Sequence, residues 1–176
     1  MPIDDVSYLP QAMLATLDVV LECLDGTPLG RPAESGLYHT SPPADCCDAV
    51  YVYVESISAT KTFPSPYQGP IQCGQLAPVV NVAVKVYRDC WPVVQDSAVA
   101  PFPPTADTTV AAANLQMDAL ALFCCLMSDL SDPDGSIRGG VCVQASIGSI
   151  DPGAPQGGCT SWTIRFKLEL DVPCCV

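Results

Sequence analysis

Residues 162–170 read Trp162-Thr163-Ile164-Arg165-Phe166-Lys167-Leu168-Glu169-Leu170, a strict alternation of apolar and polar side chains. A strand places successive side chains on opposite faces, so this stretch would bury its apolar set and expose its polar set. One buried and one solvated face is typical of an antiparallel sheet. We therefore expect a strand here, with Arg165, Lys167 and Glu169 on the open face of the sheet.

Three other stretches predict strands of the same sheet. Residues 49–57 are rich in valine and tyrosine and alternate with period two. Residues 138–148 carry a weaker pattern of the same kind. Residues 79–88 predict a strand with Lys85 and Tyr87 on one face, and on the other face Val80, Val82, Val84 and Val86.

Two stretches have the periodicity of helices. Residues 7–24 have Ser7 as a start cap and Gly26 as a stop, and residues 105–130 begin at Thr105 or Asp107 and end before the turn at 132–135. Both carry an apolar stripe that we expect to be buried. The stripes are Leu9, Met13, Leu14, Leu17, Val20, Leu21 and Leu24 in the first helix, and Leu115, Ala119, Leu122, Phe123, Leu126 and Leu130 in the second.

The element order is therefore α-β-β-α-β-β, which predicts an α+β fold with two helices packed on a mainly antiparallel four-stranded sheet. At 176 residues the chain suits one domain, and we expect residues 1–176 to form it. Proline and glycine mark three long loops at 25–48, 59–77 and 89–104. Loops of this length are usually functional or ordered by a partner, so we expect those at 25–48 and 59–77 to contact other subunits.

The charge balance argues against nucleic acid binding. The net charge is −12, and the seven basic residues are scattered along the sequence, whereas a phosphate-binding surface needs them clustered. Only 15% of the residues are charged and 49% are hydrophobic, which suggests that other subunits cover part of the surface. No continuous apolar run is as long as a membrane span, so we expect a soluble chain with no membrane partner.

The residues give little support for catalysis, a cofactor or a metal. His39 is the only histidine and has no nucleophile signature beside it. The Asp132-Pro133-Asp134-Gly135 turn lacks the spacing of a calcium loop. Phosphate-binding glycine motifs are absent from the sequence, and so is the C-x₂-C spacing of zinc modules. We therefore expect no enzyme, no cofactor and no metal site.

Eleven cysteines need a separate explanation, since the acidic start Met1-Pro2-Ile3-Asp4-Asp5 is unlike a secretion signal. Two readings stay open for most of them, buried thiols and disulfides that tie loops to the sheet. The Cys124–Cys125 pair falls in the apolar part of the long helix, so we expect both to be buried thiols. The candidates for disulfides are Cys23, Cys47, Cys73, Cys90, Cys142 and Cys159.

Several short motifs together resemble small virion proteins of long-tailed phages that infect actinobacteria. The motifs cover most of the chain. They are Leu21-Glu22-Cys23, Arg31-Pro32, Asp45-Cys46-Cys47-Asp48 with Val54-Glu55, Val86-Tyr87-Arg88-Asp89-Cys90-Trp91-Pro92, Met117-Asp118-Ala119-Leu120-Ala121-Leu122 and Gly153-Ala154-Pro155-Gln156-Gly157-Gly158-Cys159.

The resemblance implies a head-to-tail connection protein, and in particular a tail terminator. Such a protein forms a ring, commonly a hexamer, that caps the tail tube and docks to the neck connector proteins, while DNA passes through the lumen without specific binding. It would assemble in the host cytoplasm and end in the virion, where strand-end cysteines could oxidise late. The alternatives are a head-completion or stopper protein, and a thiol- or metal-dependent binding module. Candidate subunit contacts are Arg31, Lys61, Arg165, Lys167 and Glu169.

Overall fold

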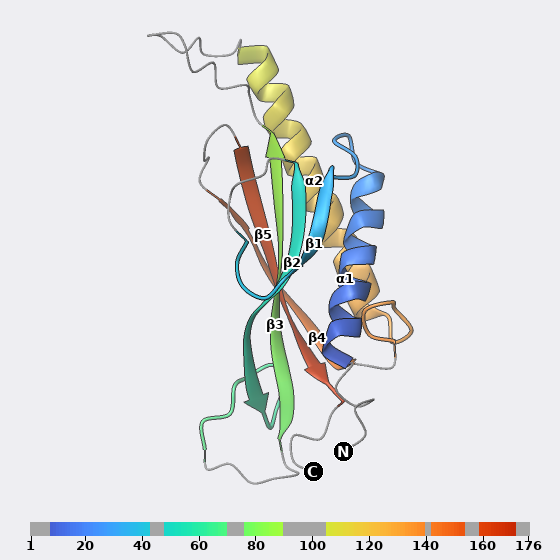
Figure 1. The fold of residues 1–176 in the computed structure, drawn as a ribbon, viewed down its shortest axis with the longest axis vertical. Coiled ribbons are helices and arrows are strands. Elements are labelled where there is room, and N and C mark those ends of the chain that lie inside the picture. The colour runs from blue at the N-terminus through green and yellow to red at the C-terminus, as the bar shows by residue number, and fades with distance from the viewer. Residues whose placement is uncertain are drawn as a thin grey trace.

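Two helices pack on one face of a five-stranded sheet in the computed structural model (Figure 1). The structure describes residues 8–42, 48–69, 76–89, 105–139, 142–153 and 159–171. In chain order the elements are α1 (Tyr8–Asp25), β1 (Glu34–Tyr38), β2 (Ala49–Thr60), β3 (Ala77–Asp89), α2 (Thr105–Ser131), β4 (Cys142–Pro152) and β5 (Cys159–Leu170). The predicted α+β class and both predicted helices are confirmed.

The sheet has five strands where the sequence predicted four. Its order is β1-β2-β3-β5-β4, and every pair is antiparallel except β1 with β2, which is parallel. The additional strand, β1, lies inside the predicted loop 25–48. Its residues Glu34–Tyr38 do not alternate in polarity, and four of the five are exposed at the edge of the sheet. A strand without a buried face leaves no period-two signal in the sequence, which is why this one was missed.

The core lies between the helices and the inner face of the sheet, as the alternation in residues 79–88 and 162–170 predicted. All four valines at the even positions of β3 and all five apolar residues of 162–170 in β5 belong to it. They pack against the buried side of α1 and against Leu122, Leu126 and Leu130 of α2. One predicted member is wrong, because Leu14 of α1 lies 52% exposed.

The outer face of the sheet carries a second, smaller cluster. Ala49, Tyr51 and Tyr87 are buried there, and Tyr38 from β1 packs edge-to-face on Tyr51 with ring centroids 4.9 Å apart. The Tyr87 hydroxyl donates a hydrogen bond to the Pro42 carbonyl at 3.3 Å. The tyrosines therefore cover one end of the outer face.

Helix α2 is longer than the part of the sheet that it covers. Figure 1 shows its N-terminal end extending past the ends of the strands. The 23 residues of Thr109–Ser131 are long and apolar enough to cross a membrane by length and composition, so the expectation that no such segment exists was wrong. The buried side of this helix packs on the sheet, however, and includes the fully buried carboxylate of Asp118.

Candidate interaction surfaces

A buried guanidinium joins four parts of the chain at the end of β3. Arg88 is 3% exposed, and its Nε donates to Oδ2 of Asp118 on α2 at 2.9 Å. One terminal nitrogen donates to Oδ1 of Asp48 at 2.7 Å, and the other lies 2.8 Å from Asp118 Oδ2 and donates to the Gly30 carbonyl at 2.6 Å. A planar guanidinium suits this task because it offers several donors in fixed directions. We call these four residues the Arg88 cluster.

The Arg88 cluster also sets the position of the parallel edge strand. The backbone N–H of Ala33 donates to Oδ2 of Asp48 at 3.0 Å, and the N–H of Glu34 donates to the Asp48 carbonyl at 3.2 Å. Asp48 has a φ of 59°, a conformation that is uncommon for residues other than glycine. The carboxylate that binds Arg88 therefore also holds the start of β1 against the start of β2.

Three motifs that were singled out in the sequence meet at this cluster. Asp48, Arg88 and Asp118 come from three separate stretches, 40 and 30 residues apart along the chain. Sequence reasoning named the stretches but gave these three residues no joint role. The sequence signal that could have indicated this cluster was an acidic residue in the apolar part of the long helix together with a basic residue at the end of a buried strand.

The open face of the sheet carries a row of paired charges. Arg165 on β5 donates through Nε to both carboxylate oxygens of Glu55 on β2, at 2.9 and 3.0 Å, and also pairs with Asp151 on β4. Partial burial alone would lower the pKa of the Arg165 guanidinium, but the hydrogen bond and charge of Glu55, with the charge of Asp151, raise it above its ordinary value. Three strands are thus linked across the surface.

A shallow groove of about 340 Å³ lies on this face, beside the charged row. Lys167 lines it and donates from Nζ to the Pro64 carbonyl at 3.3 Å, and Asn81 and Ser56, which are hydrogen-bonded to each other, also line it. Glu169 is half-buried on the same strand. Of the candidate contacts, Arg165 and Lys167 therefore lie together on the open face, and Arg165 already has its charge partners within the chain.

The other candidate residues lie apart from this groove. Arg31 is exposed after α1, and Lys61 is exposed just after β2. His39 is exposed after β1, and in the described part of the chain no three His, Cys, Asp or Glu side chains gather closely enough to hold a metal ion.

The outward side of α1 is acidic. Asp18, Glu22 and Asp25 are exposed and follow one another at spacings of four and three residues, which places them on one side of the helix. Neither α1 nor α2 contains a lysine or arginine. Glu22 and Asp25 lie near the C-terminal end of α1, where the helix dipole disfavours negative charge. A basic surface placed against this side would relieve that repulsion.

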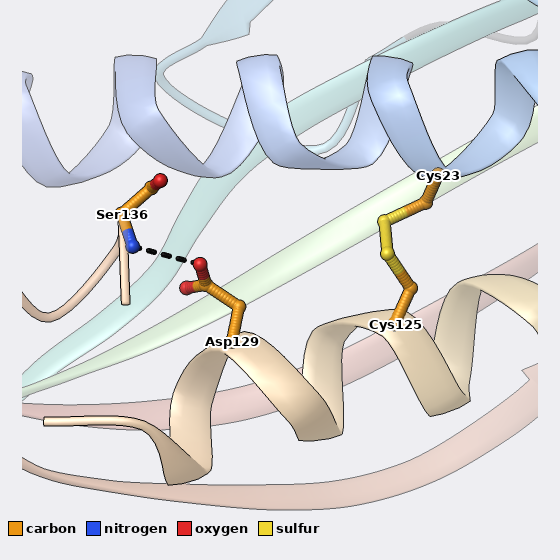
Figure 2. The surroundings of a disulfide bond; sticks show 4 residues. All are labelled: Cys23, Cys125, Asp129 and Ser136. Carbon is orange, nitrogen blue, oxygen red and sulfur yellow. Dashed lines mark hydrogen bonds between the residues drawn. A yellow bond between two sulfur atoms is a disulfide. The ribbon is translucent and has the colours of Figure 1, made fainter. Parts of the chain in front are cut away.

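A disulfide joins the two helices. Cys23 of α1 is bonded to Cys125 of α2, with their Cα atoms 6.0 Å apart, and Figure 2 shows the bond bridging the two helices one turn from Asp129. The Asp129 carboxylate in turn accepts the backbone N–H groups of Ser136 and Ile137 at 2.7 and 3.0 Å. The expectation of two buried thiols at 124–125 was therefore wrong at both positions, since Cys125 is bonded and Cys124 is an exposed free thiol.

The remaining cysteine predictions have mixed outcomes. Cys23 and Cys159 are both disulfide-bonded, as predicted. Cys142 is a free thiol, which corrects its assignment as a bridging residue. Its Sγ–H donates to the carbonyl of Gln144, two residues further along β4, at 2.9 Å. Cys47, Cys73 and Cys90 lie outside the described residues.

Burial gives Cys142 a testable pH dependence. Loss of hydration raises the pKa of its thiol, and this outweighs the nearby Arg138 and the backbone hydrogen bonds, which lower it. The folded state therefore holds this proton more tightly than the unfolded chain. The resulting stability is complete below the ordinary thiol pKa of about 8.5 and is lost as the pH rises through the folded-state value.

We expect the free energy of unfolding of the wild type to fall more steeply than that of Cys142→Ala as the pH rises above about 8.5. Urea unfolding at a series of pH values measures the free energy of unfolding of both proteins. All other titrating groups are the same in the two proteins, so the difference between the two pH profiles comes from Cys142. Parallel pH profiles for the two proteins would contradict the raised pKa. Cys142 should also be alkylated more slowly than the exposed Cys124.

No protein-family model matches this chain, and no curated protein sequence matches it.

Proposed function

We propose that the chain is a structural subunit that assembles head to tail into a ring, and that this ring is the terminator of a phage tail. The observation that carries the ring is the difference in charge between the two sides of the fold. Three exposed carboxylates line α1, whose layer has no base. The opposite, open face of the sheet has three bases, Lys85, Arg165 and Lys167, among the carboxylates of Glu55, Asp151 and Glu169.

Two of these bases are available to a partner. Lys85 lies over the Tyr87 ring at 4.9 Å, and Lys167 donates to a backbone carbonyl. Neither forms a salt bridge with any carboxylate among the described residues. The α1 side of one copy therefore has an electrostatic complement on the sheet face of the next copy. A contact between two different surfaces is heterologous, and a heterologous contact closes into a ring when its rotation allows.

The assignment to a phage tail is the part that the sequence motifs suggest. A ring with a net charge of −12 on each subunit would repel DNA from its lumen, which suits a channel through which DNA passes without binding. The partners would be a tail tube protein and a neck connector protein, and the stopper of the neck is the alternative position. The protein would act without catalysis, in the virion.

Charge reversal tests the ring contact. We expect Glu22→Lys or Lys167→Glu alone to weaken the assembly about 10- to 100-fold, because each places like charges against one another. The double variant Glu22→Lys/Lys167→Glu should recover most of the loss. Native mass spectrometry and sedimentation at moderate salt would measure the assembly.

Asp134→Lys is the matched control, since it makes the same charge change on an exposed turn after α2. A wild-type chain that stays monomeric, or a double variant no better than either single one, would overturn the head-to-tail contact. The tail role has its own test. Antibodies against the chain should label the head–tail junction in electron micrographs of virions that contain it, and labelling elsewhere would reject that role.

A further inference from the structure

The exposed side of α2 carries apolar residues with the spacing of a coiled coil. Leu120 is 62% exposed, and Val110, Met117 and Met127 are also among the exposed large apolar residues. On the side that faces away from the sheet, apolar residues recur at alternating intervals of three and four residues. This is the spacing of the a and d positions of a heptad. We call this set the α2 seam: Val110, Ala113, Met117, Leu120, Cys124 and Met127, all exposed.

The α2 seam faces away from the core of its own chain. The side of α2 that packs on the sheet holds Asp118, Leu122, Leu126 and Leu130, so the two sets lie on opposite sides of the helix. Most globular helices have a polar outer side. Between Thr109 and Ser128 the one charged residue is Asp118, which is fully buried. The seam is thus a strip without charge on a chain whose net charge is −12.

We propose that the α2 seam binds the α2 seam of a second copy of this chain. The other exposed large apolar residues of the described chain are scattered over α1, β1, β2, β4 and the loop after α1. Among the described surfaces of a second copy, the α2 seam is therefore the one whose apolar spacing and lack of charge correspond to those of the first seam. Two copies that meet along uncharged strips avoid the repulsion that their acidic surfaces would otherwise cause.

A lipid surface is the competing occupant, and the composition of α2 disfavours it. Helices that lie on membranes usually carry lysine or arginine on their polar side, which attracts anionic headgroups. α2 contains no basic residue, and the side opposite the seam is occupied by the sheet and the Arg88 cluster.

Two orientations of the paired helices place different seam residues opposite one another. In a parallel pair, with the twofold axis along the helices, Cys124 lies opposite Cys124 of the second copy. In an antiparallel pair Cys124 lies near Ala113 of the second copy. The α1 carboxylates lie level with the C-terminal part of the seam, because Cys23 is bonded to Cys125, and they stay apart in both arrangements.

The size of the seam predicts a weak pair. Val110 to Met127 spans roughly 26 Å and a helix strip is about 10 Å wide, so two seams would bury roughly 500 Å² in total. Stable interfaces usually bury at least about 1,200 Å². We therefore expect a dimer that dissociates at micromolar concentrations. This contact is twofold and separate from the head-to-tail contact of the proposed ring, so it holds or fails independently of that proposal.

The test uses the full chain and two matched variants. Leu120→Lys places a charge in the seam, and Ile57→Lys makes the same change on β2 at a residue of similar exposure, 61% against 62%. We expect sedimentation of the wild type between about 1 and 200 µM to show concentration-dependent pairing, at least tenfold weaker in Leu120→Lys and unchanged in Ile57→Lys. Circular dichroism checks that both variants keep their helices.

A short bis-maleimide gives the orientation, because it can join Cys124 of one wild-type copy to Cys124 of another only in a parallel pair, as peptide mapping would show. A wild type that stays monomeric at 200 µM overturns the proposal, and so does pairing that Leu120→Lys leaves intact. Pairing that depends on the seam supports the proposal, and the presence or absence of the Cys124–Cys124 cross-link then assigns a parallel or an antiparallel arrangement. Binding of a monomeric wild type to phosphatidylcholine/phosphatidylglycerol vesicles that Leu120→Lys abolishes would assign the seam to lipid instead.

Discussion

Replacing Arg88 with methionine is expected to lower the free energy of unfolding by about 3–5 kcal/mol, because it leaves the buried Asp118 carboxylate without its counter-ion. Asp118 is fully buried, and its Oδ1 makes no hydrogen bond within the described part of the chain. The guanidinium is therefore the main compensation for that charge. The same substitution releases Asp48 and the Gly30 carbonyl. Urea unfolding at pH 7 measures the loss, with the midpoint falling at nearly constant slope.

Two further variants separate the buried charge from the shape of the site. Arg88→Met combined with Asp118→Leu removes both charges and fills the same space, so it should be more stable than Arg88→Met alone. Arg88→Lys keeps the charge but carries its three donors on one nitrogen, which cannot reach Asp118, Asp48 and Gly30 together, so we expect an intermediate loss. A loss below about 1 kcal/mol in Arg88→Met, or a double variant as unstable as the single one, would contradict the role given to this cluster.

The elements with a buried side were predictable from the sequence. Residues 162–170 and 79–88 each have one apolar face, and the structure buries those faces against the helices. A strand that buries one face needs alternating apolar and polar residues, so such a strand can be recognised in the sequence by its period of two. β1 has no such requirement, because Glu34–Tyr38 lies exposed at the sheet edge and is held by backbone bonds and by Asp48. Its side chains therefore form no pattern from which the pairing with β2 could be predicted.

The buried side of α2 was predicted correctly, because Leu122, Leu126 and Leu130 are buried and Leu120 and Met117, which lay outside the predicted stripe, are exposed. The errors within the helices fall on apolar residues beside the core, at Leu14 and at the cysteine pair. At such positions an apolar side chain in the sequence does not show whether it faces the core, the other helix or solvent.

The Arg88 cluster was beyond prediction for a third reason. Each of its members is ordinary by itself: an aspartate before a strand, an arginine at the end of one, and an aspartate in a helix. Their meeting depends on the order of the strands and on the placement of α2. The open face of β5 was predicted correctly, but the pairing of Arg165 with Glu55 and Asp151 requires the register of three strands.

Replacing Cys125 with alanine is expected to lower the free energy of unfolding by about 2–5 kcal/mol under non-reducing conditions. The Cys23–Cys125 bond closes a loop with a sequence separation of 102 residues, and a long loop restricts the unfolded chain strongly. The bond also fixes α1 to α2, which share the core below them. Urea unfolding without reductant measures the loss, and Cys23→Ala should show a loss of similar size.

The adjacent cysteine supplies the control. Neighbouring residues of a helix point about 100° apart, so when Cys125 faces α1 its neighbour Cys124 faces outward. Cys124→Ala removes a free, exposed thiol and should change the stability by less than about 0.5 kcal/mol. Substitution is a sharper test than reductant, because Cys159 is also disulfide-bonded and reduction would open that bond as well. If Cys124→Ala is as destabilising as Cys125→Ala, the helix is rotated relative to α1, and the outward direction of the α2 seam is wrong too.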